Sequence, residues 1–516
     1  MSGLYQAAGI VFFFNLVSKM LGYFRDAVLA AYYGAGSLTD AYMIAYTLPY
    51  SLQAVLGMAF LTVMVPFLTG FLMQGKRQEA FRLTSVVVRK VGFWLLVLVV
   101  LGMILARPVT RIMAPGFDEA AIRQTAGLMR VMLPSIFLMG MGMLYSGVLN
   151  AEKKFALVAF APGLVNILMM LGIILLNGTL GIYGAAVGTL AGFAGFYLLL
   201  WRGIRKMGFS FSLSAGDPEG MTRPVLQGIL PVAVSVSVNQ VLLAVSRFFA
   251  SGLEAGSISA LDFANRIMNL PLGIFTAAVV TAAFPLMTEG AARNETEKLA
   301  STLIRGIRAI LVFIIPVSVG MVILRVPLVE LLYQRGQFMA RDTVMTAGAL
   351  YWFSVALPAF SSNMMMTRAF YACRDYRTPL LAGLAAVAVN AAASRLLVGA
   401  FAHNGLAAAN ALAAYSYTLL LLVLLVRRLG RLNLPYLARG ILKSMAASAL
   451  MGWAVLSLRG FIATLRPAGT GTTVLILGAG ALAGVIIYFS VLKLLKYEEL
   501  NEALGFLRKR RTKEKR

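Results

Sequence analysis

The charged residues that could carry chemistry in this sequence lie inside long apolar stretches. Lys19, Arg25 and Asp26 occur together in the segment SKMLGYFRD, residues 18–26. A charged side chain at the centre of a bilayer costs at least about 2.5–3.5 kcal/mol on insertion scales, so it usually faces a partner or a polar cavity. A cavity with more cations than anions favours an anionic ligand, and the guanidinium fork fits phosphate oxygens particularly well.

Helical geometry limits which of these three charges can act together. Lys19 and Arg25 are six residues apart, about 240° around an ideal helix, so they share a face only if the helix is kinked. Gly22 lies between them and permits such a kink. Arg25 and Asp26 are adjacent, and adjacent residues on a helix point in different directions. We therefore expect their side chains not to face each other.

Two further charges occur where a membrane-spanning helix is expected. Asp40 stands at the start of a predicted helix at 39–72. It is either an N-cap at the positive end of the helix dipole or a residue of a polar cavity. Arg266 lies in the segment DFANRIMNLPLGIF, between the uncharged polar residues Asn265 and Asn269. Arg266 adds to the excess of positive charge expected in a cavity.

Other arginines in apolar stretches have a simpler explanation. A long basic side chain near a helix end can extend its charge to the membrane surface. We expect this, rather than contact with a ligand, for Arg130, Arg247 and Arg395. A structural alternative also stays open for Arg25 and Asp26, in which they pair with each other and hold the protein together without binding a substrate.

The sequence lacks the equipment of an enzyme. It has one cysteine, Cys373, and one histidine, His403, so it predicts neither an internal disulfide nor a zinc site. No P-loop, HExxH or GxSxG motif occurs, and the loops hold no paired carboxylates. A polyprenyl-diphosphate phosphatase or glycosyltransferase would need acidic or histidine clusters. We expect no catalytic residue, no metal and no cofactor.

The elements that position these charges are membrane helices. The 516 residues are 60% hydrophobic and 13% charged, and the mean hydropathy is +0.82. Soluble chains carry roughly 25% charge. The apolar residues form runs of about twenty, enough to span roughly 30 Å of hydrocarbon. This predicts an all-α polytopic membrane protein with about fourteen transmembrane helices, at 6–34, 39–72, 83–106, 120–149, 155–177, 181–203, 224–252, 257–288, 300–324, 343–372, 379–401, 405–427, 440–459 and 470–495.

The basic residues predict the orientation of the chain. The net charge is +26, and the basic loops follow the even-numbered predicted helices, as in Lys153 and Lys154 or Arg427 and Arg428. Positive loops lie on the cytoplasmic side and face anionic membrane lipids. We therefore expect a multi-pass protein of the cytoplasmic membrane with both termini inside. Nucleic-acid binding is not expected, because no aromatic-basic platform accompanies the charge.

An internal repeat predicts the domain organisation. AGSLTDAYMIAYTLP at 35–49 resembles AGSISALDFANRIMNLP at 255–271, and 161–192 resembles 385–413. Copies in the same order, about 220 residues apart, predict two pseudo-symmetric six-helix lobes, an architecture of alternating-access transporters. The predicted parts are an N-lobe at 1–208, a C-lobe at 209–430, two added helices at 431–496 and a basic cytoplasmic tail at 497–516.

Several of these stretches together resemble the MurJ/MviN family of lipid II flippases, in the multidrug/oligosaccharidyl-lipid/polysaccharide exporter superfamily. The resemblance covers most of residues 1–430. It implies that the substrate is lipid II, an undecaprenyl-diphosphate-linked peptidoglycan precursor moved from the inner to the outer leaflet. The segments that carry it are SKMLGYFRDAVLAAYYGAGSLTDAYMIAYTLP (18–49), APGF (114–117), APGLVNI (161–167), SRFFASGLEAGSISALDFANRIMNLPLGIF (246–275) and LLYQRGQF (331–338).

The resemblance also implies a cationic cavity that binds the diphosphate. Gln53 stands where related sequences often carry arginine, and Asn269 stands where a glutamate is common, so part of the family pattern is missing. The candidate substrate-binding residues are Ser18, Lys19, Arg25, Asp26, Asp40, Gln53 and Arg266.

Some members of the family resemble sodium-coupled transporters, and the corresponding positions here have lost their carboxylates. The candidate remnant of that ion site is Ser246, Asn390, Ser394 and Asn410. A monovalent cation would have only neutral dipoles as ligands, so we expect that this chain has no such sodium site.

Two other transport functions stay open from the sequence. A flippase for another polyprenyl-diphosphate-linked oligosaccharide, such as a capsule or O-unit repeat, would share the fold and the diphosphate chemistry. A multidrug antiporter of the same superfamily would need acidic residues in a cavity that here is expected to be basic. We expect a monomer that works beside cell-wall synthesis partners.

Overall fold

The structure is a computed structural model that describes residues 2–430, 432–465, 467 and 469–497. Over these residues the secondary structure is helical, without a β-strand. The chain forms two compact units. The first comprises Met1–Ser259 with Arg335–Met339, and the second comprises Ala260–Gln334 with Ala340–Arg516.

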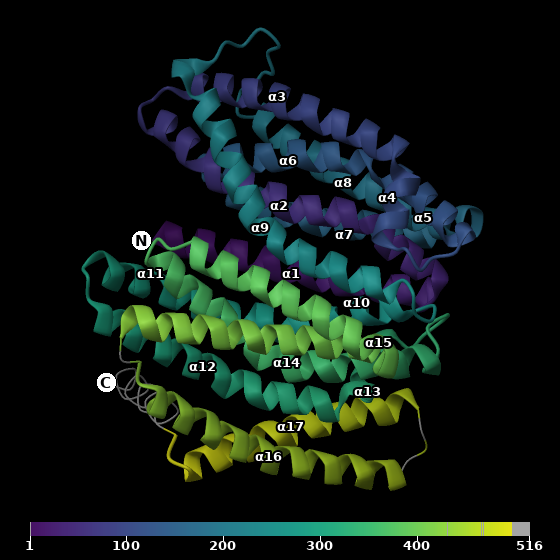
Figure 1. Ribbon diagram of the computed structural model, residues 1–516. Helices are drawn as coiled ribbons and strands as arrows, with labels where there is room; N and C mark the ends of the chain where they lie inside the picture. The colour runs from purple at the N-terminus through teal and green to yellow at the C-terminus, as the bar shows by residue number, and fades with distance from the viewer. Residues whose placement is uncertain (1, 431, 466, 468, 498–516) are drawn as a thin grey trace. The chain divides into compact units, whose positions relative to one another are not determined.

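In the first unit, the helices α2 and α7 each pack against at least two other helices. α1 packs against α7, which packs against α8, and α2 packs against both α6 and α9 (Figure 1). The elements are α1 (Ser2–Tyr33), α2 (Ser37–Met73), α3 (Arg77–Ile104), α4 (Ala106–Met113), α5 (Glu119–Met132), α6 (Pro134–Ala151), α7 (Phe155–Leu180), α8 (Ile182–Arg205), the 3-10 turn η1 (Pro218–Gly220) and α9 (Thr222–Ala250).

The second unit is built around α12, which packs against α14 and α16. α16 and α17 form an adjoining helix pair. The elements are α10 (Ser257–Pro271), whose first turn belongs to the first unit, the π-helical turn η2 (Leu272–Thr276), α11 (Ala277–Ala292), α12 (Thr296–Ile323), α13 (Arg325–Tyr333), α14 (Ala340–Ala372), α15 (Arg377–Leu429), α16 (Leu434–Leu465) and α17 (Thr470–Leu494).

The prediction of a polytopic α-helical membrane protein is confirmed. Among the described residues, eleven helical segments are long and apolar enough to cross a membrane. α15 is broken at Ala402, where φ is 48°, and so contributes two spans. α1 and α9, with 32 and 29 residues, also have the length of a span. These segments correspond to the fourteen predicted helices.

The structure adds short elements that the apolar runs did not predict. The helices α4 and α13 follow α3 and α12 after a break of one residue. Two predicted spans are also interrupted, one before Pro134 and one after Pro271, where the π-helical turn begins. Proline has no N–H to donate to the preceding turn, so it favours these interruptions.

The two-lobe division at 1–208 and 209–430 stays a prediction. It is defined by repeated sequence, whereas the compact units group residues by contact, and contact places α9 in the first unit. The end of the predicted basic tail, residues 498–516, lies outside the described residues.

Candidate functional site

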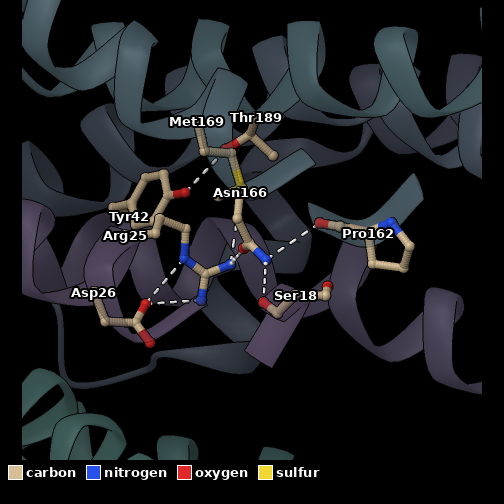
Figure 2. A network of polar contacts seen from close by, with 8 residues as sticks. All are labelled: Ser18, Arg25, Asp26, Tyr42, Pro162, Asn166, Met169 and Thr189. Atoms are coloured by element: carbon tan, nitrogen blue, oxygen red, sulfur yellow. Dashed lines mark hydrogen bonds and ion pairs between the residues drawn. The ribbon is translucent and has the colours of Figure 1, made fainter. Parts of the chain in front are cut away.

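Arg25 of α1 is a buried charge of the first unit, and its residue is only 8% exposed. Its Nε and Nη2 donate to Oδ1 of Asp26 over 3.0 and 2.7 Å, and Asp26 is 1% exposed (Figure 2). The expectation that these adjacent residues do not face each other is wrong. The arginine stem is long enough to bring the guanidinium back over the neighbouring carboxylate, although their Cα–Cβ bonds diverge.

Asn166 of α7 holds the other side of the Arg25 guanidinium. Arg25 Nη1 donates to Asn166 Oδ1 over 3.0 Å. Asn166 Nδ2 in turn donates to the carbonyl oxygens of Ser18 and Pro162, both over 3.2 Å (Figure 2). The amide therefore joins α1 to α7, with its Oδ1 as an acceptor and its Nδ2 as a donor. Ser18 takes part through its backbone oxygen.

Three more side chains, those of Met169, Tyr42 and Thr189, lie around this network. Met169 Sδ lies 3.8 Å from Arg25 Nη1. Tyr42 of α2 and Thr189 of α8 share a hydrogen bond of 2.9 Å between their hydroxyl groups (Figure 2). The network therefore draws on α1, α2, α7 and α8, which a short motif in the sequence cannot reveal. Asn166 was missed as a site residue; the only signal was a polar residue in an apolar helix, inside the segment 161–167.

Arg247 of α9 is a second buried arginine in the first unit. Its residue is 6% exposed, its Nη1 donates to the carbonyl oxygen of Met43 over 2.9 Å, and it also contacts Thr47 Oγ1. The expectation that this side chain extends to the membrane surface is wrong, because α2 offers it a carbonyl and a hydroxyl within reach. Arg130 and Arg395 are exposed, and the extension of their side chains to the membrane surface stays a prediction.

Asp40 acts as a cap, but for a helix other than its own. Its Oδ2 accepts from Gly256 N over 2.7 Å, and its Oδ1 accepts from N and Oγ of Ser259 over 2.8 and 2.7 Å. These backbone N–H groups lie at the beginning of α10, where the helix dipole also favours a carboxylate. Gly256 has φ +96°, and a Cβ there would lie 2.3 Å from the oxygen of Ala35, so only glycine fits this close approach.

The other predicted substrate-binding residues are placed as follows. Lys19 of α1 is exposed and Gln53 of α2 is half-buried, both in the first unit. Arg266 of α10 is half-buried in the second unit. Nearby on α10, Asn269 Nδ2 donates to the carbonyl oxygen of Asn265 over 2.9 Å. Lys19 and Arg25 differ in burial, in agreement with their expected positions on different faces of α1.

The candidate remnant of the ion site is neutral. Asn390 and Ser394 of α15 are one helical turn apart and fully buried, and neither side chain has a hydrogen-bond partner among the described residues. Asn410 Nδ2 donates to Leu406 O over 3.0 Å, and Ser246 is half-buried on α9. Over the described part of the chain, no three His, Cys, Asp or Glu side chains come together as a metal site would require.

The chain shares its fold with a class of membrane transporters. A solved structure described as an inward-facing conformation of a multidrug resistance MATE family transporter of the MOP superfamily is similar, with a TM-score of 0.64 and 17% identity. The match covers 80% of this chain and 94% of that one. The chain is thus a polytopic membrane protein with the fold of a MOP-superfamily transporter.

The sequence narrows this class to one family. The model of the family described as lipid II flippase MurJ matches residues 29–477, so the chain belongs to the lipid II flippase MurJ family. A probable lipid II flippase MurJ of Rhizobium tropici is 30% identical over 497 residues, covering 92% of this chain and 91% of the relative. A structure of lipid II flippase MurJ in an inward closed conformation has a TM-score of 0.81 at 23% identity, covering 96% of this chain and 99% of that one.

Proposed function

We propose that this chain moves lipid II from the inner to the outer leaflet of the cytoplasmic membrane, and that Arg25 is one of the groups that bind its diphosphate. The observation that supports this site is an arginine 8% exposed on a helix with the length of a membrane span. Parallel N–H groups of a guanidinium fit phosphate oxygens with charge-assisted hydrogen bonds. The choice of lipid II over another polyprenyl-diphosphate-linked oligosaccharide rests on family membership.

Asp26 and Asn166 have different roles in this proposal. Asp26 is a charged competitor, because the two N–H groups that reach its Oδ1 are those that a phosphate would use. Asn166 is a positioning residue, because its hydrogen bond to Nη1 can persist while the carboxylate exchanges with phosphate. The ion pair keeps the buried cation neutralised when no substrate is bound, which lowers the cost of its burial.

The remaining predicted contacts are kept as part of the proposal. Lys19 and Arg266 would add positive charge, and Ser18, Asp40 and Gln53 would line the path of the head group. Arg247 joins this set as a buried cation of the first unit, with a hydrogen bond to Met43 O that fixes its direction.

The proposed mechanism is alternating access. We also propose that both termini lie on the cytoplasmic side. The orientation rests on the basic loops, which prefer the cytoplasmic face. A membrane potential that is negative inside favours outward movement of an anion by about 2.3 kcal/mol per charge per 100 mV. Collapsing the potential with an ionophore should therefore slow transport. We expect the protein to be a monomer. We also expect it to leave the lipid chemically unchanged, and mass analysis of the recovered lipid can test this.

The test is complementation of a bacterial strain depleted of its own lipid II flippase. Wild type should restore growth, whereas Arg25→Ala should fail at matched membrane levels. Arg25→Lys separates charge from geometry, because it keeps the cation and loses the paired N–H groups. Arg395→Ala is the matched control, since this arginine is exposed on α15.

Each outcome bears on a different part of the proposal. Failure of Arg25→Ala with normal growth of Arg395→Ala supports diphosphate binding at Arg25. Growth of both variants would refute diphosphate binding at Arg25. The proposal that lipid II is the substrate would still stand. Failure of the wild type, despite correct insertion, would instead favour another polyprenyl-diphosphate-linked oligosaccharide as the substrate.

A further inference from the structure

Two lysines of the first unit, Lys154 and Lys206, line a cavity whose lining does not include Arg25. This open cavity of about 580 Å³ is lined by residues of α1, the beginning of α7 and the end of α8. Its apolar wall includes Phe14, Leu157, Phe160 and Gly203. Phe14 and Phe160 meet edge to face, with ring centroids 5.6 Å apart. Lys154 and Lys206 complete the lining, so the cavity combines an apolar wall with two positive charges.

These two lysines have no carboxylate beside them in the described structure. Both are exposed, and neither takes part in an ion pair among the described residues. The acid nearest in sequence to Lys154 is Glu152, which accepts from Arg77 Nε over 2.8 Å and is thereby already neutralised. Two like charges that line one cavity repel each other, so they favour an anion between them.

The second copy of the repeat has an acidic residue at the corresponding position. Lys153 and Arg374 both adopt the left-handed region, with φ of 60° and 58°. The residues that follow them are Lys154 and Asp375. Further along each copy, IRKMG at 204–208 corresponds to VRRLG at 426–430, and each segment ends in a glycine with positive φ. Lys206 therefore corresponds to Arg428, and Lys154 corresponds to Asp375.

The second copy carries its own anion at this position. Asp375 forms an ion pair with Arg428. Its Oδ1 also accepts from Thr378 N over 3.0 Å, at the beginning of α15. In the first copy, the equivalent helix α7 begins without a side-chain cap, and lysine replaces the aspartate. The first copy thus lacks the carboxylate that completes the same turn in the second.

We propose that this cavity binds an anionic phospholipid, with the headgroup phosphate between Lys154 and Lys206 and part of an acyl chain against Phe14 and Phe160. The phosphate takes the place that Asp375 fills in the second copy. The apolar wall explains why the anion is a lipid rather than a free ion. The site is distinct from the Arg25 network, and the proposal does not depend on lipid II transport.

The experiment titrates the purified full-length protein in detergent with phosphatidylglycerol or phosphatidylcholine, and measures bound lipid by native mass spectrometry. Lys154→Asp recreates the aspartate of the second copy and lets it pair with Lys206. We expect this variant to bind phosphatidylglycerol at least about thirtyfold more weakly, because an anion replaces a cation that contacts the phosphate and each of the two charges contributes about 1 kcal/mol. Its melting temperature without lipid should equal or exceed that of the wild type, which shows that it folds.

Lys153→Asp is the matched control, because it makes the same charge change on the neighbouring residue, which does not line the cavity. It should bind phosphatidylglycerol within threefold of the wild type. Ala156→Trp fills the cavity without changing its charge and should also weaken binding. The proposal is overturned if Lys153→Asp loses binding as strongly as Lys154→Asp, or if phosphatidylcholine binds as well as phosphatidylglycerol. The placement of the acyl chain would be overturned if Ala156→Trp bound phosphatidylglycerol as well as the wild type does. It would also be overturned if inorganic phosphate raised the melting temperature of the protein as much as phosphatidylglycerol does.

Discussion

Arg25 and Asn166 are 141 residues apart in the sequence, and a hydrogen bond of 3.0 Å joins Nη1 of the first to Oδ1 of the second. Because the donor is charged and buried, this bond should contribute about 1.5–3 kcal/mol to stability. A double-mutant cycle with Arg25→Ala and Asn166→Ala, measured by unfolding in mixed micelles, should give a coupling energy of that order. Additive effects of the two substitutions would show that the bond contributes little.

The carboxylate of Asp40 should contribute more to stability than any one of the groups that donate a hydrogen bond to it. Asp40→Ala removes the acceptor of three hydrogen bonds, and we expect a loss of about 2–3 kcal/mol in unfolding free energy. Ser259→Ala removes only the hydroxyl bond and should cost about 1 kcal/mol. Thermal unfolding of the two variants in the same detergent compares them. An equal loss in both would contradict the capping role of the carboxylate.

Gly116 should not accept even a methyl group. A Cβ there would lie 2.3 Å from Gly252 Cα, and backbone cannot move aside as a flexible side chain can. Gly116→Ala should therefore lower the unfolding free energy by about 1–3 kcal/mol. Gly399→Ala is the control, because nothing lies within 4 Å of a Cβ at that helical position. It should stabilise the protein by up to about 1 kcal/mol. A harmless Gly116→Ala would disprove the close approach.

Asp375 should make stability depend on pH in acid. Partial burial tends to raise the pKa of Asp375, but hydrogen bonds from Thr378 and the charge of Arg428 together lower it below its usual 3.8. A lowered pKa stabilises the folded protein above pH 3.8, and this contribution is lost as the pH falls through the folded value. Asp375→Asn should lower the melting temperature at pH 7, and its difference from wild type should shrink below pH 3.8. A difference that stays constant with pH would contradict this linkage.

Asn390 should be replaceable without loss of stability. Its amide is fully buried and has no hydrogen-bond partner among the described residues. Replacing such a group with an apolar side chain of similar size removes the cost of its desolvation. Asn390→Leu should therefore leave the melting temperature unchanged or raise it. Sodium should not shift the melting temperature of the wild type, and a sodium-dependent shift that Asn390→Leu abolishes would show that an ion site survives.

The architecture could be read from the sequence because hydrophobic length is a local property. A run of about twenty apolar residues forms a membrane helix whichever helices it later contacts. For this reason the fourteen predicted spans correspond to helical segments of the structure, and the burial of Arg25 and Asp26 was predictable from the cost of charge in a membrane. The short helices α4 and α13 carry no such signal, since eight or nine residues do not span a bilayer.

What the tertiary structure decided is which partner each charge has. Asn166 reaches Arg25 only because α7 packs against α1, and Arg247 is buried only because α9 brings it to the Met43 carbonyl of α2. The side chain of Asp40 serves residues more than two hundred positions away. The length of the apolar runs determines which segments are membrane helices, but hydrogen bonds between helices depend on packing and on side-chain reach. The sequence therefore determined that these charges are costly and few, and only the packed helices determined what neutralises them.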